Sequence, residues 1–224
     1  MFHPEGPSLL ELIRQALSST EQGYDLLAPK FEKTPFCTPA PLLEAAHELL
    51  PRGQSGLDLC CGTGAGLGLL SSLGCQRLVG VDFSRGMLEQ ARRTHPDAEL
   101  VQADVLQARY HNEFDLVTFF GALGHILPED LPALVDVVDR ALRPGGTFIF
   151  FVLPRTGIRN LAYLAACALF DLAMRVRNVL LKPEFVMYYL ASSRRWFYQL
   201  LRERGFQVQE QAVQGCILVQ ARKC

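Results

Sequence analysis

The sequence predicts an α/β fold built on a seven-stranded, mostly parallel sheet with helices on both faces. Short apolar runs rich in Val, Leu and Phe alternate with helical patterns between about residues 55 and 153. Such alternation indicates a parallel sheet covered on both sides. Two further strand patterns lie at the C-terminal end, at 206–210 and 216–222, and they predict two strands that close the sheet.

An N-terminal arm of about 40 residues precedes the first strand. Ser8 and Glu11 have the spacing of a capping box, which predicts a helix from Leu9 to Leu17. A second short helix is expected over 23–31. The prolines that follow predict a constrained loop, because proline fixes φ and stops a helix.

The remaining elements follow from hydrophobic periodicity and from glycine or proline punctuation. Strands are expected at 55–60, 77–82, 98–102, 114–119 and 146–153. Helices are expected at 41–50, 66–73, 86–94, 131–142 and 192–204.

Residues 154–190 form an unusual insertion after the fifth strand. The stretch from Leu161 to Phe170 is strongly apolar, but it is far shorter than the roughly 20 residues that span a bilayer. Three interpretations fit the insertion: a helical cap over a substrate pocket, a dimer surface, or a helix in a membrane interface with basic flanks. We expect a single domain over 1–224, with 1–40 as a lid and 154–190 as the cap.

Composition narrows the function. A net charge of −1 gives no electrostatic reason to expect nucleic acid as a partner. The seven cysteines show neither a disulfide framework nor a zinc-type pair. We therefore expect reduced thiols and no bound metal. The N-terminus lacks the pattern of a secretory signal, and a cytoplasmic location is the expectation.

The most informative stretch runs from Leu57 to Gly66, a buried strand followed by a glycine-rich turn. A second strand ends in Asp82, whose carboxylate can accept hydrogen bonds from both hydroxyls of a ribose. The glycines do not match the dinucleotide fingerprint, because Leu67 occupies its third glycine position. Asp58, four residues before Gly62, would repel a pyrophosphate but suits a ligand that carries an ammonium group.

These motifs resemble those of class I methyltransferases that depend on S-adenosylmethionine (SAM). The resemblance runs from Leu57 to Gly146 and includes the 102–105 segment, the 114–122 strand motif and the turn at 142–146. Cys60 departs from the family, in which many members have glycine. The Cys60-Cys61-Gly62-Thr63-Gly64 version is similar to the ubiquinone and menaquinone C-methyltransferases, although residues 122–126 differ from their pattern.

The resemblance implies a Rossmann-like fold and SAM as cofactor, held by residues that follow the strands. Asp82 would hold the ribose, Asp104 the adenine amino group, and Phe120 and Gly121 the methionine portion. Phe83 and Met87 suit either adenine or ordinary core packing. The full expected set is Asp58, Cys60, Gly62, Gly64, Asp82, Phe83, Met87, Asp104, Val105, Phe120 and Gly121.

His125 is the candidate catalytic residue, because it follows the fourth strand where the methyl group should emerge. A neutral imidazole there could take a proton from the acceptor, or it could only orient the loop. Tyr24, Lys33 and Thr34 are expected to contact the cofactor carboxylate or to pack in the lid. Tyr188, Tyr189 and Arg155 are further candidates to face the substrate.

The sequence therefore favours methyl transfer to an O, N or C atom of a small, partly hydrophobic metabolite. A non-catalytic SAM-binding protein or partner subunit is the first alternative, and an NAD-dependent oxidoreductase is the second. A small-molecule acceptor is the expected partner of a monomer or homodimer. No transmembrane segment is expected, and peripheral membrane contact is compatible with the sequence.

Overall fold

The computed structural model describes residues 4–34, 36–152, 161–182, 184–188, 194–213 and 215–224, with 161–164 and 194 as backbone only. A seven-stranded sheet forms its centre, in the order β3-β2-β1-β4-β5-β7-β6. The strands are β1 (Ser55–Leu59), β2 (Arg77–Asp82), β3 (Glu99–Gln102), β4 (Phe114–Phe119), β5 (Leu142–Val152), β6 (Phe206–Val213) and β7 (Cys216–Lys223).

The sheet is parallel from β3 to β5 and antiparallel at the end formed by β7 and β6. This mostly parallel, seven-stranded arrangement confirms the predicted fold class. The strand order reverses between β2-β1 and β4, and ligands of such sheets bind outside the carboxyl ends of strands at that point.

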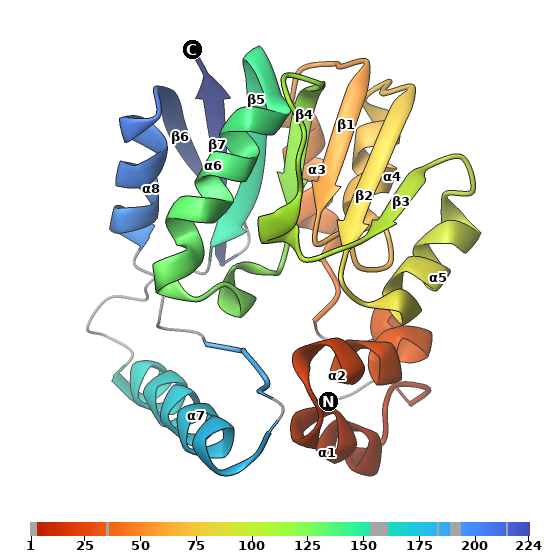
Figure 1. Ribbon diagram of the computed structural model, residues 1–224, viewed down its shortest axis with the longest axis vertical. Helices are drawn as coiled ribbons and strands as arrows, with labels where there is room; N and C mark the ends of the chain where they lie inside the picture. Colours follow the sequence, from red (N-terminus) through yellow and green to blue (C-terminus); the bar gives the residue numbers. More distant parts are fainter. Residues whose placement is uncertain (1–3, 35, 153–160, 183, 189–193, 214) are drawn as a thin grey trace.

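Helices cover both faces of the sheet (Figure 1). α3 (Ala40–Leu49), α4 (Ala65–Ser72) and α5 (Arg85–Thr94) follow the arm and the first two strands. α6 (Leu131–Ala141) and α8 (Arg194–Glu203) lie on the face that is nearer in Figure 1. Short 3-10 turns η2 (Val105–Gln107), η3 (Leu123–His125) and η4 (Pro128–Asp130) connect the elements near the carboxyl ends of the strands.

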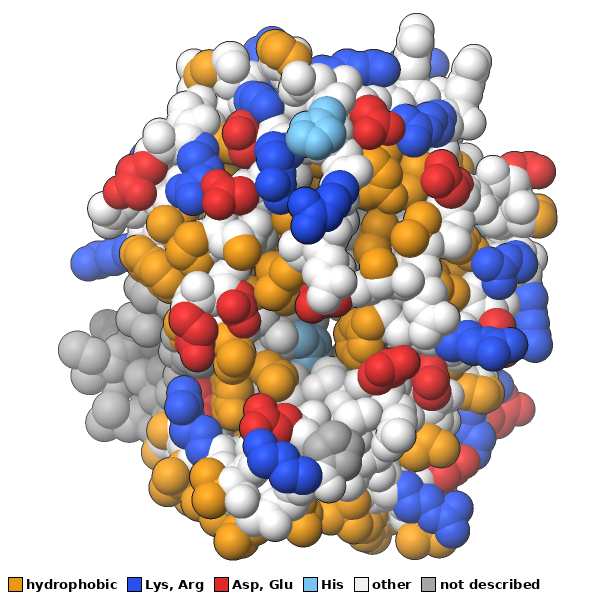
Figure 2. All heavy atoms as spheres, in the orientation of Figure 1, with side chains coloured by type: hydrophobic (Ala, Val, Ile, Leu, Met, Phe, Trp, Pro, Cys, Tyr) orange, Lys and Arg blue, Asp and Glu red, His pale blue; other side chains and the backbone are white. Residues whose placement is uncertain are grey.

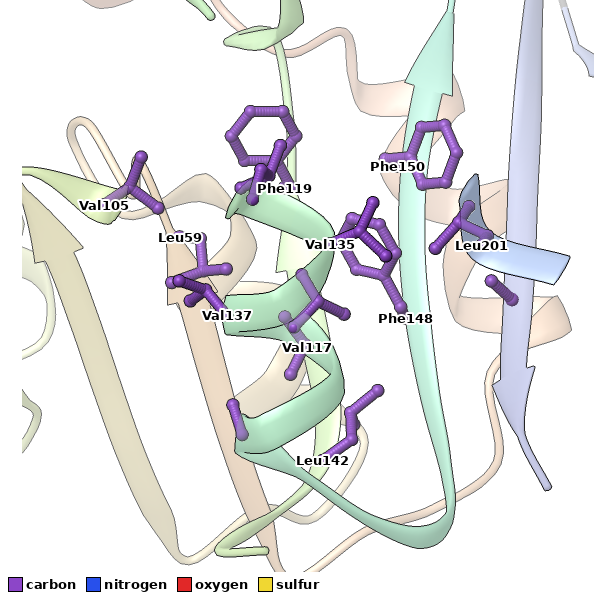
Figure 3. Close-up of a cluster of buried hydrophobic side chains, with 14 of the residues drawn as sticks. Leu59, Val105, Val117, Phe119, Val135, Val137, Leu142, Phe148, Phe150 and Leu201 are labelled. Atoms are coloured by element: carbon purple, nitrogen blue, oxygen red, sulfur yellow. The ribbon is translucent and has the colours of Figure 1, made fainter. Parts of the chain in front are cut away.

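The largest core cluster lies between the sheet and α6 and α8. Figure 3 shows Phe119 of β4 and Phe148 and Phe150 of β5 with Val135 of α6 and Leu201 of α8 around them. The rings of Phe148 and Phe150 stack with centroids 4.9 Å apart. Burial of these aromatic side chains supplies a large part of the hydrophobic free energy that holds this layer.

The remaining helices form a separate layer beyond the carboxyl ends of the parallel strands (Figure 1). They are α1 (Leu9–Leu17), α2 (Thr20–Leu27), η1 (Ala28–Lys33) and α7 (Leu161–Leu180). The predicted capping box is present: the Glu11 N–H donates to Ser8 Oγ, and the Ser8 N–H donates to the Glu11 carboxylate.

The prediction of a helix over 23–31 is wrong in its bounds. α2 begins at Thr20 because the Ser19 side chain caps it, accepting from the Gln22 N–H at 3.1 Å. It ends at Leu27, where Pro29 lies in the first turn of the 3-10 helix η1. Proline cannot donate the hydrogen bond that would continue the α-helix.

Among the described residues, no helix is long and apolar enough to cross a bilayer. All seven cysteines lie in the described part of the chain, and none of them is in a disulfide there.

Candidate functional site

The glycine turn after β1 and the carboxylate that ends β2 meet at the carboxyl edge of the sheet. The Gly62 N–H donates to Asp82 Oδ2 at 2.8 Å, and the Ser84 N–H donates to Asp82 Oδ1 at 2.9 Å. Gly62 has a φ of +52°, and a Cβ there would have no atom within 4 Å. The two predicted residues are thus brought together beside open space, as close approach of a ligand to the backbone requires.

Asp82 is 6% exposed, and its burial raises the pKa of the carboxyl group to about 6. The two backbone N–H groups act in the opposite direction and favour the carboxylate form. The carboxylate is therefore ionised at neutral pH and retains lone pairs for a further donor.

Asp58 lies inside the protein, between β4 and the start of α4. Thr118 Oγ1 donates to Asp58 Oδ1 at 2.6 Å, while Oδ2 has no hydrogen-bond partner among the described residues. A Cβ at Gly66 would overlap the Asp58 carboxyl group, so only glycine fits there. Burial and the nearby Asp82 raise the pKa of Asp58 to about 7.

The geometry of Cys60 explains why many members of the family have glycine at this position. Its φ is +54°, in the left-handed region that glycine adopts at no steric cost. Burial and three neighbouring aspartates raise the pKa of the Cys60 thiol well above its usual value. The thiol therefore stays protonated and lacks the reactivity of a thiolate.

Gly64 also has a positive φ, +101°, at the N-cap of α4. A Cβ there would lie 2.6 Å from the His95 ring, so close packing adds to the conformational requirement.

The residues predicted to surround adenine differ in their exposure. Asp104 is exposed and caps η2 by accepting from the Leu106 N–H at 3.0 Å, while Val105 is buried. Phe83 is partly exposed beside the Tyr24 ring. Met87 is 1% exposed, which leaves almost no surface for a ligand.

The residues that follow β4 lie on both sides of the strand end. Phe120 is buried and stacks on Phe151 at a centroid distance of 6.0 Å. Gly121 is exposed with a φ of +73°. Of the two, only Gly121 has its surface open to a ligand.

His125 and Tyr24, both candidates from the sequence, form a hydrogen-bonded pair. His125 Nδ1 lies 2.5 Å from the carbonyl oxygen of Val186, and Nε2 lies 2.7 Å from the Tyr24 hydroxyl. A carbonyl only accepts, so Nδ1 carries the proton and Nε2 accepts from Tyr24. Burial lowers the pKa of His125, so the imidazole is neutral at pH 7.

The N-terminal arm contacts the site at three points. Besides Tyr24, Asp25 Oδ1 accepts from Ser84 Oγ at 2.6 Å and from the Gly86 N–H at 2.8 Å, at the start of α5. Glu32 accepts from the hydroxyl of Thr63 in the glycine turn. Sequence reasoning missed Asp25 and Glu32, because no local pattern indicates which distant backbone group a carboxylate will reach.

Other candidates lie away from the strand ends or outside the described residues. Lys33 pairs with Glu5, and Thr34 is buried with its hydroxyl donating to the Phe31 carbonyl at 2.7 Å. Tyr188 is buried, and its hydroxyl accepts from the Asn178 side chain at 3.2 Å. Tyr189 and Arg155 lie outside the residues that the structure describes.

The space-filling view shows a hollow between the sheet layer and the helical layer, with a histidine side chain visible in it (Figure 2). An orphaned buried carboxylate oxygen, a glycine turn open to solvent and a strand-end carboxylate fit a ligand with an ammonium group and a ribose.

The chain is similar to known methyltransferases in sequence and in fold. Residues 57–146 match a family model described as a methyltransferase domain. The chain is 31% identical over 172 residues to a 2-phytyl-1,4-naphtoquinone methyltransferase of Nostoc punctiforme, covering 70% of this chain and 73% of that protein.

A demethylmenaquinone methyltransferase of Staphylococcus saprophyticus is 36% identical over 103 residues, covering 43% of each chain. This chain spans about half of the length of the first curated relatives, or less. An O-methyltransferase family protein from Burkholderia thailandensis has the same fold, with a TM-score of 0.73 at 18% identity over 96% of this chain and 67% of that one.

Proposed function

Because the chain belongs to the class I SAM-dependent methyltransferases, whose cofactor is SAM, we propose that it transfers a methyl group to a small, partly hydrophobic metabolite. The observation that carries the proposal is the hydrogen bond from Gly62 to Asp82, which joins the glycine turn and the ribose-type carboxylate. The names of two relatives, both quinone methyltransferases, support an acceptor with a hydrophobic body.

The protein's part in this reaction is binding, alignment and exclusion of water. Bound SAM would supply a methyl group activated by its sulfonium, with S-adenosylhomocysteine as the leaving group. Asp82 accepts from the ribose hydroxyls, and Asp104 accepts from the adenine amino group. Asp58 Oδ2, buried and without a partner among the described residues, would stabilise the cationic end of the amino-acid portion through one water.

Residues 1–40 act as the lid and 154–190 as the cap in this proposal. Tyr24 of the lid and the carbonyl of Val186 in the cap both bond to His125, so the two segments meet at the site.

His125 and Tyr24 act together as the base. Nε2 already accepts from the Tyr24 hydroxyl. An acceptor O–H that reaches the Tyr24 oxygen gives it a proton, while Tyr24 passes its own proton to Nε2. The hydrogen bond to Val186 stabilises the imidazolium that forms.

Calorimetric titration with S-adenosylhomocysteine, with NAD⁺ in parallel, tests the cofactor. We expect binding of adenosylhomocysteine only, weakened several-fold or more in Asp82→Ala. An unchanged affinity in that variant would refute the ribose assignment. Binding of NAD⁺ alone would favour an oxidoreductase.

Transfer of labelled methyl from SAM to reduced 1,4-naphthoquinones, with and without an alkyl chain, tests the reaction. His125→Asn should lower turnover by about 100-fold or more while adenosylhomocysteine still binds. Cofactor binding without transfer to any acceptor would favour a non-catalytic subunit. We propose a cytoplasmic location and no nucleic-acid partner for the same protein.

A further inference from the structure

Helix α1 has its polar and apolar sides reversed with respect to the protein. Gln15 is its buried residue, whereas Leu9, Leu10, Ile13 and Leu17 are all exposed. A surface helix of a globular protein normally turns its apolar stripe inward.

Helix α7 is reversed in the same way. The buried residues of α7 that the structure describes are Cys167, Asp171, Met174 and Asn178. Two of these four side chains are polar. Asn178 is fully engaged there, since it bonds the backbone N–H and carbonyl of Phe185. The outward side carries large apolar residues: Leu169, Leu172, Val176, Val179 and Leu180.

The two reversed helices are joined into one surface. The Arg177 guanidinium of α7 donates to the carbonyl oxygens of Ala16 at 3.1 Å and Ser18 at 2.7 Å, at the end of α1. We call the exposed apolar residues of α1 and α7 named above the apolar end. Figure 2 shows apolar side chains along the lower rim of the molecule, where Figure 1 places α1 and α7.

The exposed charged residues of α1 and α7 are mostly basic. Asp171, the acidic residue of α7, is buried, while Arg175 of α7 and Arg14 of α1 are exposed. Glu11 of α1 is held by Lys30 at 2.7 Å. A symmetric second copy would add the same cations to the interface, whereas anionic lipid headgroups would complement them.

The segment 184–188 connects the apolar end with His125, the candidate base. The segment 184–188 follows α7; its Val186 carbonyl accepts from His125, and its Tyr188 N–H donates to the Gly124 carbonyl at 2.8 Å. Phe185 of the same segment packs beside Gly23 of α2. The segment that follows α7 is therefore in direct contact with the candidate base.

We propose that α1 and α7 lie in the headgroup region of a bilayer that contains anionic lipids, and that the methyl acceptor is drawn from that bilayer. The part that concerns the acceptor rests on the proposed function. A helix with an apolar outer side and basic flanks binds such an interface through buried apolar area and electrostatic attraction.

Sedimentation with vesicles tests the surface. The wild-type chain should bind vesicles of phosphatidylcholine with phosphatidylglycerol, and less tightly vesicles of phosphatidylcholine alone. The double variant Val179→Glu/Leu180→Glu changes side chains that are 82% and 74% exposed, so the fold should persist. It should bind about tenfold less tightly or worse, because two anchors become anionic.

The matched control is Gln199→Glu/Gln207→Glu, which adds the same charge at exposed positions of α8 and β6. It should bind vesicles as the wild type does. Equal binding by the Val179/Leu180 variant, or no vesicle binding by a monomeric wild type, would overturn the proposal. A dimer that dissociates in that variant would assign the surface to a second copy instead.

Adenosylhomocysteine affinity of the same variants, measured without vesicles, separates the two proposals. It should be unchanged in both double variants. Vesicle binding without adenosylhomocysteine binding would contradict the proposed function and leave the bilayer surface supported.

Discussion

The sheet layer and the helical layer of this protein place their apolar residues in opposite ways. In the sheet layer, Phe148 and Phe150 are fully buried between strands and helices. In the helical layer, the apolar end faces outward. Every exposed large hydrophobic side chain that the structure describes belongs to residues 9–36 or 169–181.

The two layers are consequently held together in different ways. Hydrophobic burial stabilises the sheet layer, as in most globular domains. The helical layer has a small apolar cluster around Phe185, and polar contacts attach it to the sheet layer, such as Asp25 with α5 and Tyr24 with His125. The difference indicates that the sheet layer is a scaffold and that the helical layer serves recognition.

The largest difference between the two layers is expected for substitutions of large apolar residues by alanine. Phe148→Ala should lower the free energy of unfolding by about 3–5 kcal/mol, because it leaves a cavity in the core. Leu180→Ala, at a position 74% exposed, should change it by less than about 0.5 kcal/mol. Chemical denaturation of both variants measures this, and similar losses would contradict the division into two layers.

The variant Asp58→Asn measures how much the buried carboxylate lowers the free energy of unfolding. A pKa raised from 3.8 to about 7 means that stability is lost as pH rises through that window, since the unfolded state gives up its proton first. This shift in the pKa of Asp58 corresponds to a loss of roughly 4 kcal/mol in the free energy of unfolding.

At pH 8 the Asn variant should be more stable than the wild type by about 1–3 kcal/mol, less than the full shift because its amide N–H groups lack partners. The advantage should vanish near pH 3, where the wild-type carboxyl is largely protonated in both states. Denaturation at the two pH values measures it, and an advantage that does not change with pH would show that Asp58 is not destabilised by burial.

Asp25→Ala weakens the attachment of the helical layer to the sheet layer. It removes the acceptor for Ser84 Oγ and for the Gly86 N–H, at an expected cost of about 1–2 kcal/mol. Hydrogen exchange should accelerate in α1 and α2 and stay unchanged in β1 and β4. Asp25→Asn keeps an acceptor oxygen and is the control, whose exchange should remain close to that of the wild type.

Cys60 offers the smallest test, within the glycine turn. Both Cys60→Gly and Cys60→Ala remove the thiol, but only glycine adopts a φ of +54° without strain. The Gly variant should be more stable than the Ala variant by about 1 kcal/mol in thermal unfolding. A more stable Ala variant would show that the turn relaxes when the thiol is removed.

Much of the sheet layer could be predicted from the sequence, because its signals are local. Apolar periodicity, the glycines after β1 and the acid at the end of β2 each describe their own segment, and parallel strands bring their carboxyl ends together. Asp82 and Gly62 were therefore expected at one site, and they share a hydrogen bond there. The two expected closing strands, at 206–210 and 216–222, follow from the same kind of local pattern.

The tertiary structure alone decided the environment of Asp58, the pairing of Tyr24 with His125 and the direction in which α7 faces. The sequence shows that α7 is apolar, but helical periodicity does not say which side another layer will cover. That side is chosen by Asp171 and Asn178, which are buried, and by the 184–188 segment, whose backbone Asn178 binds. Such choices depend on groups far apart in the chain, whereas sequence patterns report only on neighbours.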